Sequence, residues 1–430
     1  MQQLPEHFLQ YIWQHQRFDF RDLRTTTGEK ITIVATGALN TNAGADFSMA
    51  KIYLDDLLWV GDVEIHWQSS DWYAHAHNKN PAYNRVVLHV VGNDNVAATL
   101  NQKGEKVPTL CISAAMIEPE LLSKYAYLGA QKQFIPCYNH FAAAAKEVMP
   151  DFLPVLAEKR LRNKAQIIVQ ELETSKQDWE QVFYQQLAYS LAANVNSAAM
   201  LMLAKACPFG LLRKYRTNLY QLEALLFGQA GLLPAQSEDL YPQQLLKEYK
   251  YLRQKHQLAP LRVETWQFSR MRPPNFPTVK IAQLAQIIFS REHLWASLLG
   301  VKNWREYELF FGVKLAAFWN DRYNFTDKKS SILPKRLGKT AIVHLLINTV
   351  APFLYAYGLS TGDGLYQQKA VELWDNLPAE NNPIIAEWVK LGQKPANAAQ
   401  SQALLELKKD YCERLNCINC AVGKRFLGIE

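Results

Sequence analysis

The stretch GADFSMAKIYLDDLLWVGDVEIHW, residues 44–67, decides the fold at the N-terminal end of the chain. Two runs rich in β-branched and aromatic residues, SMAKIYL (48–54) and LLWVGDVEIHW (57–67), are separated by only two aspartates. Short β-prone runs joined by two turn-forming residues are typical of a β-hairpin. We therefore expect two antiparallel strands, the first of which brings Asp46 back toward the end of the second.

Polar side chains occupy one face of the second expected strand. Side chains two residues apart point to the same side of a sheet, so Asp62, Glu64 and His66 should share a face. Two carboxylates that meet at a sheet edge repel each other unless a cation or a proton lies between them. We expect Asp46 and Glu64 to converge on a hard divalent cation, Mg²⁺ or Mn²⁺, which favours oxygen ligands.

The remaining sequence predicts an α+β region followed by helices. PEHFLQYIWQH (5–15) has the apolar spacing of a short amphipathic helix. From about residue 115 onward, apolar residues recur three or four positions apart. The expected fold class is α+β, with a helix and a mainly antiparallel β-meander in residues 1–115 and a large all-helical region in residues 116–430. Further strand-like runs bounded by turn formers are ITIVATG (31–37), RVVLHVVG (85–92) and VPTLCIS (107–113).

Composition places the chain among globular proteins. It has 430 residues, of which 49% are hydrophobic and 12% aromatic, enough for a sizeable core. Residues 1–18 include Glu6 and two histidines, so they lack the uncharged core of a signal peptide, and we expect a cytoplasmic protein. The best membrane candidate is AIVHLLINTVAPFLYAYG (341–358), where Pro352 and the polar side chains favour two buried helices over a membrane span.

Two segments concentrate positive charge. The net charge of +7 permits an acidic partner without requiring one. SRMRPPNFPTVK (269–280) and KKSSILPKRLGKT (328–340) are either solvated surface loops or contacts for the phosphates of DNA or RNA. The basic residues expected to bind a polyanion are Arg270, Arg272, Lys335 and Arg336.

The hairpin residues resemble the core motif of the PD-(D/E)xK nuclease superfamily. The triplet GAD (44–46) stands where that superfamily has Pro-Asp at the entry to a strand. The segment VEIH (63–66) stands where it has an apolar residue followed by Glu-x-Lys. A leading helix before a β-meander is also part of the superfamily core. The resemblance therefore implies a nuclease-like fold for the N-terminal region.

The same resemblance implies roles for individual residues. Asp46 and Glu64 would bind the divalent cation, and the Ile65 carbonyl could complete the site. Glu6 on the leading helix matches an extra acidic residue that some members use. His66 takes the place of the catalytic lysine. Lysine is a permanent cation, whereas histidine titrates near neutrality and is suited to act as a general base or a metal ligand.

Further histidines follow the second strand. SSDWYAHAHNKNPAYN (69–84) contains Asp71, His75 and His77. In an extended segment the two histidines would point the same way and, with Asp71, would offer a second site for Zn²⁺ or a phosphate oxygen. The alternative is a polar loop whose histidines and aspartate cap one another. His89 is flanked by apolar residues and is expected to be a core histidine.

Three cysteines crowd the C-terminal end. YCERLNCINC places Cys412, Cys417 and Cys420 in a Cx4Cx2C pattern. In a reducing compartment such thiols bind metal more often than they pair, but three ligands are one short of a closed zinc or iron–sulfur site. Cys137 or Cys207 could supply the fourth ligand, and we predict Cys137. The alternative is that all are free thiols.

Over nearly its full length the chain is similar to domain-of-unknown-function family 2851, through segments such as LNTNAGADF, VGDVEIHWQSSDW and RMRPPNFP. That similarity implies no activity, so three hypotheses rest on the residues above. The first is a metal-dependent phosphodiesterase acting on nucleic acid, with Asp46, Glu64 and His66 as its catalytic residues. The second is a non-catalytic nucleic-acid or protein-binding module on a degenerate nuclease-like fold. The third is a structural protein whose acidic strand face meets Arg270 and Arg272.

Overall fold

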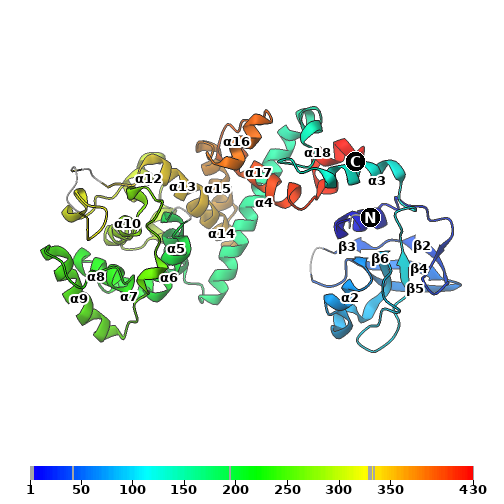
Figure 1. Cartoon of the computed structure of the whole chain (residues 1–430), viewed down its shortest axis with the longest axis horizontal. Helices are drawn as coiled ribbons and strands as arrows, with labels where there is room; N and C mark the ends of the chain where they lie inside the picture. The colour runs from blue at the N-terminus through cyan, green and yellow to red at the C-terminus, as the bar shows by residue number, and fades with distance from the viewer. Residues whose placement is uncertain (1–3, 41–42, 193–194, 328–331, 333–334, 430) are drawn as a thin grey trace. The chain divides into compact units, whose positions relative to one another are not determined.

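The protein is described by a computed structural model in which the chain forms two compact units (Figure 1). Unit 1 contains the segment up to Leu153, Ala386–Lys394 and the segment from Leu404 onward. Unit 2 contains Pro154–Ile385 and Pro395–Ala403. The residues that the structure describes are 4–40, 43–192, 195–327, 332 and 335–429.

Unit 1 is built on one seven-stranded sheet. Its strands are β1 (Leu23–Arg24), β2 (Lys30–Ala35), β3 (Ala38–Leu39), β4 (Phe47–Leu54), β5 (Leu57–Gln68), β6 (Val86–Asn93) and β7 (Thr109–Cys111). They lie in the order β1-β2-β4-β5-β6-β7, with β3 beside β4. The pairings among β1 to β5 are antiparallel, whereas β5–β6 and β6–β7 are parallel. The predicted α+β class with a mainly antiparallel sheet is confirmed, although the meander ends at β5.

The hairpin of β4 and β5 forms around a two-residue turn. Leu54 pairs with Leu57, which leaves Asp55 and Asp56 between the strands. Asp55 has a φ of 50°, in the left-handed region that aspartate tolerates better than most residues. Its carboxylate also accepts a hydrogen bond from the Lys30 backbone N–H at 2.9 Å. The turn chemistry therefore fixes the register of the hairpin.

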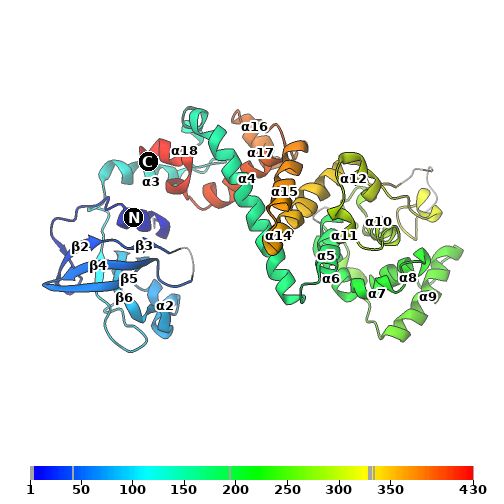
Figure 2. The same ribbon diagram turned by 180° about the vertical axis from the view of Figure 1, so that it is seen from behind.

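The middle of β5 lies inside the core of unit 1. Consecutive residues Val63, Glu64, Ile65 and His66 are all buried, so both faces of the strand are covered. Helices α1 (Glu6–Gln14) and α2 (Asp71–Ala74) both contact β5. Figure 2 shows both helices beside the sheet from the other side. Glu64 and His66 are therefore polar side chains on a fully covered strand.

Helical segments complete unit 1. Between β5 and β6 the chain forms α2 and two short 3-10 helices, η1 (His77–Lys79) and η2 (Pro81–Arg85). The helices α4, α16 and α17 each contribute one end to unit 1 and the other to unit 2. The other helical elements are α3 (Pro119–Ala130), η3 (Tyr138–His140), α4 (Phe141–Thr174), α16 (Pro383–Lys390), α17 (Ala398–Glu406), η8 (Leu407–Cys412), η9 (Cys417–Asn419) and α18 (Ala421–Leu427).

The regular elements of unit 2 are all helices among its described residues, as predicted for this part of the chain. Its short 3-10 helices are η4 (Val263–Thr265), η5 (Pro273–Asn275) and η6 (Ala317–Asn320). Its α-helices are α5 (Trp179–Leu191), α6 (Ser197–Ala206), α7 (Phe209–Arg213), α8 (Leu219–Gln229), α9 (Leu240–His256), α10 (Pro277–Phe289), α11 (Trp295–Leu299), α12 (Trp304–Phe311), α13 (Lys339–Leu345), α14 (Ala351–Thr361) and α15 (Gly364–Asn376).

The apolar segment that predicted two helices forms one continuous helical run. Helix α13 passes through a π-turn, η7 (Leu346–Val350), into α14. Pro352 lies just after this π-turn, whose altered hydrogen-bond pattern accommodates the missing N–H within the run, so the expected break is wrong. The run Lys339–Thr361 is long and apolar enough to cross a membrane, and 72% of its most apolar window is buried within the protein.

Candidate metal centre

Asp46 and Glu64 lie side by side where β4 begins. The hairpin register places Phe47 opposite Val63. The Asp46 backbone N–H donates to Glu64 Oε2 at 3.0 Å. In return, the Ile65 backbone N–H donates to Asp46 Oδ2 at 3.0 Å. The structure thus brings together the two carboxylates that the sequence placed on neighbouring strands.

Helix α1 adds two polar side chains to this pair. Gln10 donates its Nε2 hydrogen to Asp46 Oδ1 at 2.9 Å. Glu6, one turn earlier on α1, is partly buried, and burial followed by the charges of Asp46, Glu64 and another acid raises the pKa of Glu6 to about 8. Burial and then the Glu64 charge raise the pKa of Asp46 to about 7, and burial raises the pKa of Glu64 to about 7. Three carboxylates therefore lie close enough for their charges to raise the pKa values of Glu6 and Asp46.

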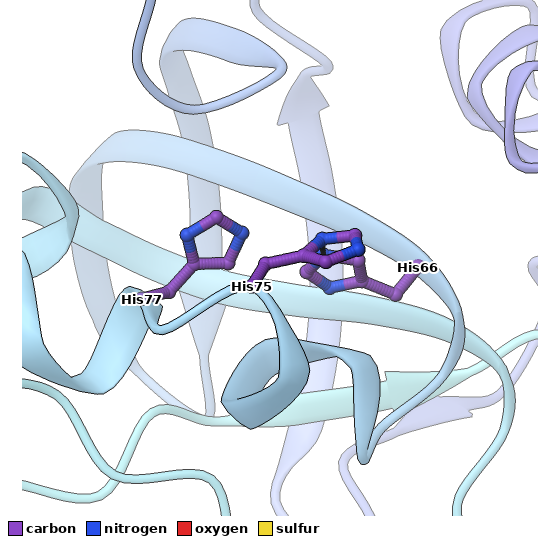
Figure 3. Close-up of side chains that lie close together, drawn as sticks. All are labelled: His66, His75 and His77. Atoms are coloured by element: carbon purple, nitrogen blue, oxygen red, sulfur yellow. Dashed lines mark hydrogen bonds between the residues drawn. The ribbon is translucent and has the colours of Figure 1, made fainter.

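Three histidines surround the inner side of Glu64. Glu64 Oε1 lies 3.1 Å from His77 Nε2 and 3.6 Å from His66 Nε2. His66 Nε2 lies 3.1 Å from His75 Nδ1. One ring nitrogen from each of the three histidines lies within 4.8 Å of the other two, and Figure 3 shows the three rings gathered beside β5. One cation could bind the three ring nitrogens, and Glu64 Oε1 lies beside two of these rings, those of His66 and His77.

The segment carrying His75 and His77 is helical and not extended as predicted. Helix α2 ends before His75, and η1 begins at His77. Ala76 between them has a φ of 58°, and the two rings meet edge to face, with centroids 5.5 Å apart at 80°. Asp71 stays outside the group of three, because its Oδ2 accepts the Gln68 backbone N–H at 3.0 Å and caps the end of β5.

A buried hydrogen-bond chain orients His66. His66 and His89 are both 0% exposed. His66 Nδ1 lies 2.8 Å from His89 Nε2, and His89 Nδ1 lies 3.2 Å from Thr99 Oγ1. If His66 Nδ1–H donates to His89 and His89 Nδ1–H donates to Thr99, His66 Nε2 keeps its lone pair for a cation. His89 has the buried position expected of a core histidine, but the sequence did not indicate that it would orient His66.

The buried histidines stay neutral. Burial, followed by the charges of His89, His77 and His75, lowers the pKa of His66 to about 2. Burial and then the His77 charge lower the pKa of His89 to about 3. A neutral His66 cannot supply the permanent positive charge of the lysine in the resembling motif. Its environment suits a metal ligand instead.

His77 carries a buried nitrogen without a hydrogen bond. Its ring is 7% exposed and stacks on Tyr83, with centroids 3.8 Å apart. Among the described residues, Nε2 has no hydrogen-bond partner, although Glu64 Oε1 lies 3.1 Å from it. A buried polar atom left unsatisfied costs about 1–3 kcal/mol. A cation held by Glu64 and the histidines would satisfy it.

Asp62 does not join the cluster, although the alternation of β5 predicted that it would. Its Oδ1 accepts the Met49 backbone N–H at 3.4 Å, and its Oδ2 lies 3.9 Å from Arg85 Nε. The pairing of β5 with β6 shifts between Asp62 and Val63. The Asp62 carboxylate is therefore occupied by contacts with β4 and with η2.

The basic residues predicted to bind a polyanion all belong to unit 2. Lys335 must be removed from that set. Its side chain is buried, and Nζ donates to the Asn320 carbonyl at 2.9 Å. Residues 328–331 and 333–334 of the same segment lie outside the described residues. The exposed members are Arg270, Arg272 and Arg336.

The fold and the cluster together define an α+β protein with a candidate centre of three histidines and one glutamate. The chain belongs to the family described as protein of unknown function (DUF2851), whose sequence profile matches residues 6–383. That match covers every residue of the histidine cluster and ends before the C-terminal cysteines. No curated protein and no solved structure matched the chain. The resemblance to nucleases stays a prediction from the sequence.

Proposed function

We propose that unit 1 is a metal-dependent phosphodiesterase of the nuclease type that acts on nucleic acid. One observation carries this proposal: His66, His75 and His77 gather beside Glu64, and His77 Nε2 is buried with no hydrogen bond among the described residues. The Asp46–Glu64 pair on a β-hairpin supports it, because this pair resembles the acidic pair of the nuclease motif. Perturbed ionisable groups gathered in one place are typical of functional sites.

The donor set favours a transition cation. Three imidazole nitrogens and one carboxylate oxygen suit Zn²⁺ or Mn²⁺, whereas Mg²⁺ prefers a shell of oxygens. We therefore place Mn²⁺ and Zn²⁺ ahead of Mg²⁺ as the cofactor. Such a cation, when bound, activates a water molecule and polarises a phosphoryl oxygen.

The chain's own residues orient the ligands and leave one side open. The Asp46 backbone N–H holds Glu64 Oε2, so Oε1 faces His77. His89 fixes the His66 ring from the buried side. His75 is exposed, whereas His66 and His77 are buried, so solvent and a phosphate group would reach the centre beside His75.

A specific observation favours a second candidate, a nucleic-acid-binding module without catalysis. His66 stands where the resembling motif has lysine, and its burial keeps it neutral. It therefore cannot stabilise developing negative charge as a fixed cation would. In this second candidate the metal would stabilise unit 1 and the basic surface of the protein would hold the nucleic acid.

The test is a binding and cleavage series with the full chain on single- and double-stranded DNA and RNA. Metal-stripped protein is compared with protein supplied with Mn²⁺, Zn²⁺ or Mg²⁺. Asp62→Asn is the matched control for Glu64→Gln, because both remove one negative charge from β5 but only Glu64 lies in the cluster. We expect cleavage that needs metal, survives Asp62→Asn and is lost in Glu64→Gln and His77→Ala.

The other outcomes separate the hypotheses. Salt-sensitive binding without metal-dependent cleavage would favour the non-catalytic module. Equal cleavage by the parent and by Glu64→Gln would overturn the proposed centre. If the protein binds none of the four nucleic acids, or binds them independently of salt, only the hypothesis of a structural protein remains.

A further inference from the structure

A second group of potential ligands comes together in unit 1 from two distant parts of the sequence. Cys137 immediately precedes η3. Cys412 is the last residue of η8, Cys417 is the first residue of η9, and Cys420 directly follows η9. His140 packs on Phe426 with ring centroids 4.7 Å apart. On the other side of Cys137, the Phe134 ring lies 5.3 Å from Lys408 Nζ. The residues on both sides of Cys137 thus contact the C-terminal segment.

The four thiols are free and sheltered. Cys137, Cys417 and Cys420 are buried, and Cys412 is partly buried. Burial and then the neighbouring Cys420 raise the pKa of Cys137 to about 12. Burial and then the other three thiols raise the pKa of Cys412 well above its usual value. The sulfurs are therefore neighbours, and none of them forms a disulfide.

The spacing of the sulfurs distinguishes between kinds of metal centre. Around one zinc ion each sulfur lies about 2.3 Å from the metal, so the sulfurs of a tetrahedral site are about 3.8 Å apart. Among the described residues, no three of these sulfurs lie within 4.8 Å of one another. An iron–sulfur cluster holds its cysteine ligands around a larger inorganic core, which fits this wider group.

Backbone groups approach the C-terminal cysteines closely. Burial raises the pKa of the Cys420 thiol, and the nearby backbone N–H groups of Gly423 and Val422 act in the opposite direction. A Cβ added at Gly423 would lie 2.1 Å from the Cys417 carbonyl oxygen, so glycine is needed for this close approach. N–H donors to a ligand sulfur orient it and stabilise its negative charge. A π-turn, η8, ends at Cys412, and such turns are frequent at functional sites.

We propose that Cys137, Cys412, Cys417 and Cys420 ligate a [4Fe–4S] cluster that fastens the C-terminal segment to the rest of unit 1. The two remaining cysteines are excluded as ligands by their positions. Cys207 is fully buried among the helices of unit 2, and the Cys111 thiol lies on β7, 3.8 Å from the Gly92 carbonyl oxygen. The inference is independent of the proposed nuclease function, because it uses neither the histidines nor the carboxylates of the first centre.

The test measures iron, acid-labile sulfide and zinc in the full chain, purified and reconstituted without oxygen. We expect about four iron and four sulfide ions per chain, with visible absorption that bleaches on reduction. Cys137→Ser, Cys412→Ser, Cys417→Ser and Cys420→Ser should each lower the iron content several-fold. Cys111→Ser and Cys207→Ser are matched controls that should retain it.

Two further variants make the result decisive. Gly423→Ala should lower iron content without removing a ligand, because its Cβ pushes on the Cys417 backbone. Glu64→Gln should leave iron unchanged, which separates this centre from the histidine cluster. Zinc without iron that is lost in Cys137→Ser but retained in Glu64→Gln would overturn the iron–sulfur assignment. A folded parent protein that binds neither metal under these conditions would overturn the site.

Discussion

Glu64 in unit 1 and Glu223 in unit 2 are two buried glutamates with similar acidity and different surroundings. Their exposed fractions are 5% and 2%, and burial raises the pKa of each carboxyl to about 7. Glu223 on α8 accepts a hydrogen bond from Tyr241 Oη at 2.6 Å. Glu64 instead faces His77, whose Nε2 has no hydrogen bond among the described residues. A raised pKa alone therefore reports burial, and what marks a site is the group of potential metal ligands beside Glu64.

Glu64→Gln should produce the largest effect, because it removes a charged ligand oxygen while keeping the side-chain size. We expect the affinity for Mn²⁺ or Zn²⁺ to fall by more than the roughly 10- to 100-fold that outer-shell changes cost. Calorimetric titration of metal-stripped protein measures it. Glu223→Gln, the same substitution in unit 2, is the control and should leave affinity unchanged. Equal affinities in the parent and in Glu64→Gln would end the distinction between the two glutamates.

Glu223→Gln should change stability in a pH-dependent way. The folded-state pKa of Glu223, about 7, lies above its usual value of 4.5, so between these pH values the folded state binds more protons than the unfolded state. The stabilising contribution of this proton uptake is complete below about pH 4.5 and is lost as the pH rises through about 7. Glutamine does not ionise and can still accept the Tyr241 hydrogen bond.

The variant should therefore gain stability relative to the parent as the pH is raised from about 5 to about 8. The gain should reach at most about 3 kcal/mol in the free energy of unfolding. Denaturant unfolding of both proteins at each pH measures this difference. A difference that does not change with pH would show that Glu223 stays ionised in the folded protein, and the two glutamates would then differ in charge as well as in surroundings.

The sequence predicted the parts of the site that depend on local rules. A two-residue turn and the alternation of a strand were enough to place Asp46 near Glu64, whereas the choice of Cys137 as a fourth ligand stays a prediction. The helical turn at Ala76 was missed, because an extended segment and a short helix have similar composition here. Its consequence is that His75 joins the group around His66, whereas Asp71 caps β5.

Packing between residues far apart in the sequence explains the contacts of His89 and Lys335, which the sequence did not predict. The parallel register of β5 and β6 puts His89 opposite Glu64, and that register depends on the crossover between the strands. Nothing near His89 in the sequence indicates that its ring would meet His66. Lys335 was expected on the surface, but its burial against Asn320 depends on the folding of unit 2. Such contacts arise from tertiary packing, which periodicity alone does not encode.

The smallest predicted effects concern the side chains behind His66, which have no counterpart at Glu223. His89→Leu removes the acceptor for His66 Nδ1–H, so the ring loses its preferred orientation, and metal affinity should fall about 10-fold. Thr99→Val removes the last member of the chain, and we expect a loss of only about 2- to 3-fold, because His89 still contacts His66 directly.

Thr109→Val is the matched control for Thr99→Val. Thr109 is also buried and pairs with His89 across the sheet, but its hydroxyl donates to the Val107 carbonyl at 3.3 Å and not to a histidine. Metal titrations should give the lowest affinity for His89→Leu and a higher affinity for Thr99→Val. The affinity of Thr109→Val should equal that of the parent. Unfolding curves without metal serve as the second readout, because a purely structural role would change stability and leave affinity unchanged. Equal affinities in all three variants would mean that His66 is held by packing alone. The surroundings of Glu64 and Glu223 would then differ only in the side chains that directly contact each carboxylate.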